Sequence, residues 1–246
     1  MTTTKSISFK PKQVTKRLLS VLGDRAKDVL VGRYGLGGKE RMTLESIGQK
    51  YGITRERVRQ IENYSLINVR KSKEYKVAQK VFDELKNLII SLGGIVSEET
   101  LLKHFSTDKS SQNHIHFLLV VGEEFKREKE DDEFNHRWHV DETLSKQIHE
   151  ALRKLYQGLS DDQLISEAEL VSSFLDHVKE VSEIYRNEEV ARRWLQISKM
   201  IDKNPLGEWG RASSSNVRAK GMRDYAFLVI RKHGSPIHFR EVAKAI

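Results

Sequence analysis

The sequence of 246 residues contains no cysteine. A disulfide and a metal site with thiolate ligands are therefore excluded. No apolar run approaches the length of a secretion signal or a membrane span, which predicts a cytoplasmic protein without a membrane contact. Prolines are scarce, at three in the chain, and apolar residues recur over long stretches with a period near 3.6. The predicted fold is therefore mainly α-helical.

Charge is abundant and unevenly distributed. Charged residues make up 32% of the chain and apolar residues 38%, a balance that favours two to four small domains over one large hydrophobic core. Residues 1–75 contain 17 Lys and Arg against 7 Asp and Glu, a net charge of +10, while the whole chain carries +8. A basic excess confined to one end is typical of a nucleic-acid contact, and it predicts binding that weakens with salt.

The basic end contains a helix-turn-helix pattern at residues 44–62, LESIGQKYGITRERVRQIE. Gly48 leaves room for the second helix to cross the first, and Gly52 supplies the positive φ that a tight turn between helices requires. An ordinary amphipathic helix has no use for either glycine, since each costs roughly 1 kcal/mol relative to Ala. The core between the helices is assigned to Ile47, Tyr51, Ile53, Val58 and Ile61.

The second helix of this pattern carries polar residues on its outer side. Thr54 is a suitable N-cap, since its hydroxyl can accept a hydrogen bond from a free backbone N–H of the first turn. Arg55 with Arg59, and Glu56 with Gln60, are four residues apart and share one face. Arg, Glu and Gln side chains can each read a base edge in the major groove. We therefore predict a DNA-binding site at Thr54, Arg55, Glu56, Arg57, Arg59 and Gln60.

A solvated charged face is the simpler explanation for such a run of charges. It explains neither the two glycines nor the five core positions. A surface that contacts only phosphate also has no use for Glu56, whose charge repels phosphate. Glu56 is better explained by a contact with a base edge, or by a contact that holds a neighbouring arginine in place.

Residues from about Arg25 to Lys71 resemble region 4 of the primary sigma factors of bacterial RNA polymerase. The resemblance rests on Arg33-Tyr34-Gly35-Leu36, on Thr43-Leu44-Glu45-Ser46-Ile47-Gly48 and on the run from Tyr51 to Glu62. It implies a module that reads the upstream promoter hexamer in the major groove and packs against the flap of the polymerase β subunit. The six predicted residues fall on positions that contact DNA in that family. After Glu62 only Arg70 and Lys71 remain of the family's second basic cluster.

The rest of the chain contains an internal repeat. Val96-Ser97-Glu98-Glu99-Thr100-Leu101 is echoed 69 residues later by Ile165-Ser166-Glu167-Ala168-Glu169-Leu170, and by a third copy that starts at Ile237. Amphipathic helices are predicted before the copies, at residues 77–92, 144–156 and 223–232. Ser97 and Ser166 are natural N-caps, so each copy is predicted to be helix, turn and capped helix.

The first two copies continue in the manner of a winged helix. A predicted helix at residues 112–121 follows the first copy, and then come the runs 125–129 and 134–140. Phe134, His136, Trp138 and Val140 alternate, which predicts a β-hairpin with these side chains on one face. The second copy has its third helix at residues 188–198 and Trp209 in the place of Trp138. Both tryptophans are predicted to anchor the cores of their wings.

The third copy resembles a HARE-type helix-turn-helix, the winged-helix module also found in the δ subunit of bacterial RNA polymerase. The resemblance rests on Asp224 to Phe227 and on His233 to Ala243. It stops at Ile246 within its second helix, so either the natural protein continues or the sequence is a fragment. The predicted domains are a helix-turn-helix domain at 1–75, winged helices at 76–140 and 141–210, a linker at 211–221 and an incomplete HARE-type unit at 222–246.

The helices expected at residues 98–105 and 167–177 are acidic. They carry few bases, and their acids are Glu98, Glu99, Glu167, Glu169 and Asp176. Acidic helices would repel a phosphate backbone. The winged helices are therefore expected to bind protein partners, or else to act as spacers that hold the DNA-binding module at a distance.

No pattern in the chain predicts catalysis or a cofactor. The run Gly35-Leu36-Gly37-Gly38-Lys39-Glu40 lacks both ends of a phosphate-binding loop and is interpreted as a turn between helices. The pairs His114 with His116 and His136 with His139 lack further ligands at useful spacing, and the wing histidines are expected at the surface. We expect no metal, no cofactor, no small-molecule substrate and no enzymatic activity.

These patterns predict a DNA-binding transcription protein that reads a promoter-type element on double-stranded DNA and contacts RNA polymerase. The segment before Arg25 is too short for the promoter-melting part of a sigma factor. The chain is therefore expected to regulate initiation, or to share the polymerase contact, rather than to initiate alone. Two alternatives remain open: a polymerase-binding adaptor without sequence readout, and the DNA-targeting part of a larger enzyme such as a restriction nuclease.

Overall fold

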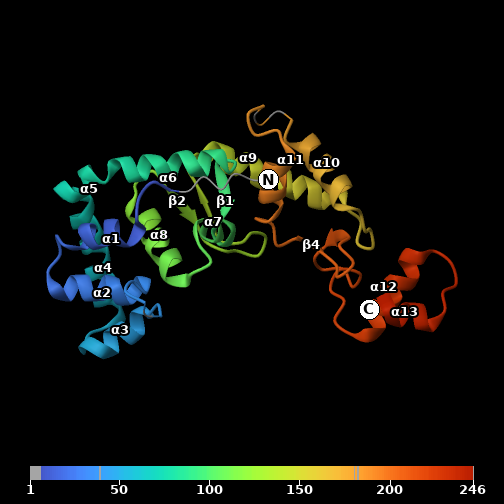
Figure 1. Ribbon diagram of the computed structural model, residues 1–246, viewed down its shortest axis with the longest axis horizontal. Coiled ribbons are helices and arrows are strands. Elements are labelled where there is room, and N and C mark those ends of the chain that lie inside the picture. The colour runs from blue at the N-terminus through green and yellow to red at the C-terminus, as the bar shows by residue number, and fades with distance from the viewer. Residues whose placement is uncertain (1–6, 39, 180, 182, 246) are drawn as a thin grey trace. The chain divides into compact units, whose positions relative to one another are not determined.

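Figure 1 shows the computed structural model, which describes residues 7–38, 40–179, 181 and 183–245. Lys39 and Ile246, which belong to two of the sequence patterns, lie outside the described residues. The chain divides into two compact units. The first contains residues up to Arg127 together with Trp138–Val140, and the second contains Glu128–Arg137 together with the residues from Asp141 onward. Both are mainly helical with short strands, as predicted.

The basic end forms the first five helices: α1 (Pro11–Leu19), α2 (Asp24–Tyr34), α3 (Leu44–Tyr51), α4 (Arg55–Lys71) and α5 (Lys73–Val77). The expected turn follows α2, where Gly35 adopts the left-handed conformation with a φ of 63°. α3 and α4 pack on each other and on α2. All five residues assigned to the core of the helix-turn-helix belong to one cluster, and Ile47 and Val58 are its fully buried members beside Val29.

A winged helix follows, whose elements lie in the first unit except for Glu128 and Arg137, which belong to the second. Its elements are α6 (Gln79–Ser91), β1 (Ile95–Ser97), α7 (Glu98–Phe105), α8 (Lys109–Val121), β2 (Lys126–Glu128) and β3 (Arg137–His139). The three strands form a sheet in the order β1-β3-β2. The Ser97 hydroxyl accepts a hydrogen bond from the Thr100 backbone N–H, so the predicted cap of α7 is confirmed. Trp138 is 1% exposed and anchors this wing, as predicted.

The second unit repeats this pattern with α9 (Glu142–Gly158), α10 (Glu167–His177), α11 (Glu188–Leu195), β4 (Ile201–Lys203) and β5 (Trp209–Arg211). Ser166 and Glu169 form a capping box at the start of α10, which confirms the second predicted cap. β4 pairs with β5 in antiparallel fashion. Ile165 forms a bridge with Trp209, so the repeated segment joins the wing here much as β1 joins β3. Trp209 is only partly buried.

The predicted alternation along the first wing is wrong. β3 covers only Arg137–His139, and all three of its side chains are buried, whereas the side chain of His136 is 40% exposed. The run does not form one strand, because Phe134 bridges to Ser198 instead of continuing β3. The expectation of surface histidines on the wing holds for His136 but is wrong for His139, because β3 is buried from end to end.

The C-terminal helices begin and end near their predicted limits. α12 (Met222–His233) ends at Gly234, whose φ is 71°, and α13 (Phe239–Ala245) follows. The division of the chain into four domains and a linker, and the HARE-type nature of the last unit, stay predictions. Within the described part of the chain, no helix has both the length and the apolar composition needed to cross a membrane.

Candidate nucleic-acid interface

The approach of α3 to α4 depends on two glycines. A Cβ atom on Gly48 would lie 2.6 Å from the backbone oxygen of Ile53 and 3.5 Å from the backbone nitrogen of Arg55, so no larger residue fits without a shift of the backbone. Gly52 ends α3 with a φ of 63°, in the left-handed region that favours glycine. The close crossing and the tight turn predicted for these positions are both present, and together they fix where α4 begins.

α4 begins with a capped, exposed first turn. The hydroxyl of Thr54 accepts a hydrogen bond from the Arg57 backbone N–H at 3.2 Å, as predicted for an N-cap. The free N–H groups of the first turn give this end of the helix a partial positive charge, which attracts phosphate. A shallow hollow of about 490 Å³ lies beside it, lined by Glu45, Gly48, Gln49, Gly52, Ile53, Thr54 and Arg57.

The six predicted DNA-contacting residues are all exposed at this end of α4. Four of them are joined by hydrogen bonds. Arg59 donates two to Glu56, Gln60 donates one to Glu56 at 3.4 Å, and Arg57 donates one to Gln60 at 3.1 Å. Among the described residues, none provides a hydrogen bond or an ion pair to the side chain of Arg55. The face thus has one unpaired arginine beside a connected group of four side chains.

The pairing of Glu56 with Arg59 changes the acidity of both groups. The hydrogen bonds from Arg59 lower the pKa of Glu56, and the Glu56 carboxylate raises the pKa of Arg59. Both side chains are more than half exposed. Glu56 therefore remains ionised at neutral pH, and its charge cancels that of one neighbouring arginine.

A second carboxylate of the motif lies on the opposite side of α4. Glu62 accepts a hydrogen bond from the Tyr34 hydroxyl at 2.8 Å, and Arg33 lies 3.5 Å from the same carboxylate oxygen. Burial raises the pKa of Tyr34, and the Glu62 carboxylate raises it further. The sequence pattern ended at Glu62 without assigning it this role. The sequence indicated this role of Glu62 only by its position, since a charged residue four places after Val58 lies on the inward side of the helix.

Arg70 does not continue the basic surface. Its guanidinium donates hydrogen bonds to the backbone oxygens of Val120 and Val121, at 2.9 and 3.0 Å, at the C-terminal end of α8. The interpretation of Arg70 as the remnant of a second basic cluster is therefore wrong, because this side chain caps another helix. Lys71 is exposed.

The carboxylates of α7 and α10 are paired with other groups, so they repel phosphate less strongly than their number suggested. Burial would raise the pKa of Glu98, but the nearby His116 ring and the hydrogen bonds from Arg127 lower it well below its usual range. Trp138 also donates to Glu98 at 2.9 Å. The other four carboxylates also have partners: Glu99 pairs with Lys103, Glu167 with Arg192 and Asp176 with Lys179, and the Glu169 carboxylate accepts hydrogen bonds from the backbone N–H and hydroxyl of Ser166.

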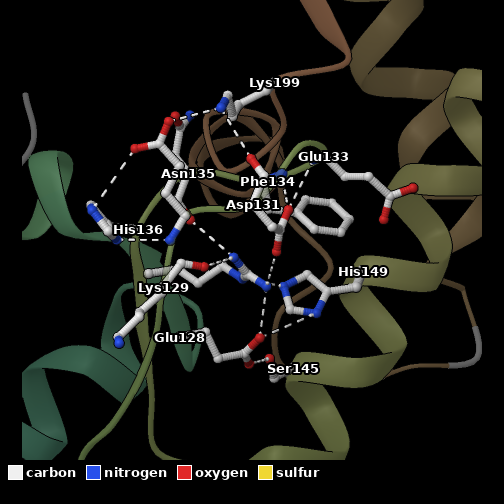
Figure 2. Close-up of polar contacts among 12 residues, drawn as sticks. Glu128, Lys129, Asp131, Glu133, Phe134, Asn135, His136, Ser145, His149 and Lys199 are labelled. Atoms are coloured by element: carbon white, nitrogen blue, oxygen red, sulfur yellow. Dashed lines mark hydrogen bonds and ion pairs between the residues drawn. The ribbon is translucent and has the colours of Figure 1, made fainter.

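The second unit contains a buried cation. Figure 2 shows Glu128, Asp131 and His149 converging on one point. The guanidinium of Arg137 donates a hydrogen bond to each of the three. The same guanidinium donates to the backbone oxygens of Lys129 and Asn135, both at 3.1 Å. Its side chain is 5% exposed. This cluster connects the loop of the first wing to α9 within the second unit, and no sequence pattern predicted it.

No group of three or more His, Asp and Glu side chains in the described ranges is arranged to hold a metal ion. His114 and His116 are both buried in α8, at 5% and 6% exposure. His116 faces Glu98 at 3.6 Å, and burial lowers its pKa. These two histidines therefore belong to the core of the first unit.

Comparison with known proteins identifies the basic end. Residues 18–71 match the family model of sigma-70, region 4. The chain is 51% identical over 53 residues to the RNA polymerase sigma factor SigA1 of Synechococcus elongatus, which is 22% of this chain and 13% of that factor. It is 41% identical over 68 residues to the RNA polymerase sigma factor SigA of Listeria monocytogenes, 26% of this chain and 18% of that factor.

A third relative is the RNA polymerase sigma factor SigA of a Nostoc species, with 47% identity over 55 residues, 22% of this chain and 14% of that factor. The chain thus spans less than a fifth of the length of these relatives. No solved structure matches the chain. The resemblance to region 4 is confirmed for residues 18–71, and the resemblance of the last unit to a HARE-type module stays a prediction.

Proposed function

We propose that this chain binds double-stranded DNA in a sequence-specific manner and acts with RNA polymerase in transcription initiation or its regulation. The observation that carries the proposal is the match of residues 18–71 to sigma-70 region 4, in a fold that leaves the start of α4 exposed. The matched relatives are RNA polymerase sigma factors by name. A role with polymerase would place the protein in the cytoplasm.

The proposed reading residues are Thr54, Arg55, Glu56, Arg57, Arg59 and Gln60. Arg55 is the strongest candidate for a direct base contact, since its guanidinium is exposed and no described residue bonds to it. Arginine can make a bidentate contact with guanine O6 and N7, worth roughly 1–3 kcal/mol of discrimination. The winged helices are proposed to bind protein, and no catalytic role is proposed for any residue.

The proposal is tested by selecting binding sites from random duplex DNA with the purified full chain, at several salt concentrations. Arg55→Ala and Glu56→Ala are selected in parallel. A defined motif in the wild type, relaxed by each substitution at particular positions, supports sequence readout by α4. Weak and unselective binding that neither substitution alters would reject it.

The second outcome would favour the adaptor alternative, in which the module binds polymerase and DNA contact is incidental. Affinity for core RNA polymerase that persists at high salt, without any DNA preference, would then be expected. The DNA-targeting part of a larger enzyme is the remaining alternative, and it predicts a selected motif without any affinity for polymerase.

A further inference from the structure

A hollow of about 460 Å³ lies in the first unit, between the start of α1, the end of α7 and the start of α8. Its apolar lining is formed by Ile7, Phe9, Phe105 and Ile115. Sites for small molecules are concave, have volumes of roughly 300–1,000 Å³, and combine a mostly apolar lining with a few polar groups that orient the ligand. The volume and the apolar side of this hollow are those of such a site.

The wall in front of α1 is fixed by the fold. Ser8 donates from its backbone N–H and from its hydroxyl to the two carboxylate oxygens of Glu84 on α6, at 2.6 and 2.5 Å. Ile7 and Phe9, on either side of Ser8, pack against the large core of the first unit, and so does Phe105. The apolar side of the hollow is thus formed without a ligand.

One polar side chain in the lining has no partner. His114 is 5% exposed, and within the described part of the chain no group forms a hydrogen bond with either of its ring nitrogens. Burial lowers the pKa of His114 and the charge of Lys12 lowers it further, whereas Asp108 raises it. The ring is therefore neutral at neutral pH, with one nitrogen that can donate and one that can accept. Buried polar groups normally have partners, so this ring lacks one that a ligand can supply.

The charges in the lining favour an anion. Lys10 precedes α1 and Lys12 lies in its first turn, and both line the hollow. The acid of the lining, Asp108, is the N-cap of α8, where its carboxylate accepts a hydrogen bond from the Ser111 backbone N–H at 2.8 Å. This bond lowers the pKa of Asp108. Two cations therefore surround a hollow whose carboxylate is already bound to the backbone of α8.

We propose that this hollow binds a small organic acid, whose carboxylate lies beside Lys12 and accepts a hydrogen bond from the ring of His114. The apolar body of the acid packs against Phe9 and Phe105. A carboxylate fits both polar groups, because it accepts from a ring N–H and pairs with an ammonium group. An inorganic anion would leave the apolar wall uncovered. None of the lining residues belongs to the proposed DNA contact, so the inference does not depend on whether the chain reads DNA.

The test titrates the full chain with phenylacetate and with hexanoate, by calorimetry and by NMR of the histidine ring nitrogens. Phenylacetamide and hexanamide are the uncharged controls. We expect at least one of the acids to bind with a Kd of about 1 mM or tighter, which a ligand of about ten non-hydrogen atoms can reach, and to shift the ring signals of His114. The matching amide should bind at least about five-fold more weakly. Absence of saturable binding by both acids, or equal binding of acids and amides, would overturn the inference.

Two variants locate the bound acid. Lys12→Met removes a charge at an exposed position and is expected to weaken binding of the acid by about five-fold. Lys16→Met, at an exposed position of the same helix outside the lining, is the matched control and should bind the acid like the wild type. His114→Phe keeps a ring without nitrogen atoms and should weaken binding by about ten-fold or more. If His114→Phe does not fold, Lys12→Met decides, and binding of the acid that Lys12→Met leaves unchanged would overturn the inference.

Discussion

Arg59 donates two hydrogen bonds to Glu56, from Nε to Oε2 at 2.8 Å and from Nη2 to Oε1 at 2.7 Å. The two residues are three positions apart on the exposed face of α4. An exposed pair of this kind contributes little to stability, because water screens it. Its larger effect is on the orientation of the Arg59 side chain, since a bidentate contact fixes the plane of the guanidinium. In the proposed DNA contact, Glu56 would thereby set the position of the Arg59 guanidinium.

Glu56→Gln separates these roles, because it keeps the size of the side chain and removes its charge. We expect tighter binding to random DNA, since an acid that repels phosphate is lost. We also expect discrimination to fall by roughly 1–3 kcal/mol at one or two base pairs. Titration of the selected duplex and its single-base variants measures both effects. Glu99→Gln, which alters an exposed ion pair on α7, is the control, and an equal effect of the two substitutions would exclude a specific role for Glu56.

Gly48→Ala tests the close crossing of α3 and α4. The added Cβ would lie 2.6 Å from the Ile53 backbone oxygen, so the two helices must move apart. We expect a loss of roughly 1–3 kcal/mol in the free energy of unfolding of the module and weaker DNA binding. Chemical denaturation followed by circular dichroism measures the first. Gly158→Ala, which meets no atom within 4 Å, is the matched control and should not destabilise the protein.

Features that depend on neighbours in the sequence could be predicted. The caps at Thr54, Ser97 and Ser166 require only a backbone N–H two or three residues further on, and all three are present. Gly52 was identified because a tight turn needs a positive φ whatever surrounds it. The same locality explains why the helices predicted from apolar periodicity correspond closely to α6, α8 and α9.

Features that depend on distant partners could not be predicted. Arg70 was interpreted as the remnant of a second basic cluster, but its acceptors lie about fifty residues further along the chain. Glu98 was counted as a free acid, although Arg127 and Trp138 neutralise and bury it. A charge in a sequence looks the same whether it faces water or a partner, so only the tertiary contacts decide its role.

Arg137→Met tests the buried cation of the second unit. The substitution keeps a long side chain but leaves the carboxylates of Glu128 and Asp131 and two backbone oxygens without this donor. The two carboxylates are partly exposed, but a polar group that loses a buried donor costs roughly 1–3 kcal/mol, so we expect the second unit to unfold at lower denaturant. Arg153→Met removes the partner of Glu133 at a more exposed site and should cost less than about 1 kcal/mol. Similar losses of unfolding free energy in the two variants would show that the burial of Arg137 does not increase its contribution to stability.

His149 makes the stability of this unit depend on pH. Its Nε2 accepts the hydrogen bond from Arg137 Nε at 2.7 Å, so the folded state holds the ring neutral. Burial lowers the pKa of His149 to about 4, and the charge of Arg137 acts in the same direction. An unfolded chain has a histidine pKa of about 6.5. Between these two values the unfolded state binds more protons, so the free energy of unfolding must fall as the pH decreases from about 6.5 to about 4.

His149→Gln removes this titration, and the free energy of unfolding should then depend less on pH within that window. Urea denaturation at half-unit steps between pH 4 and pH 7 gives the slopes for the wild type and the variant. Burial also lowers the pKa of His116, so a residual slope of the same sign is expected from the first unit. His177→Gln, at an exposed position of α10, should keep the slope of the wild type. If His149→Gln keeps that slope as well, the ring is not held neutral by Arg137 in the folded state.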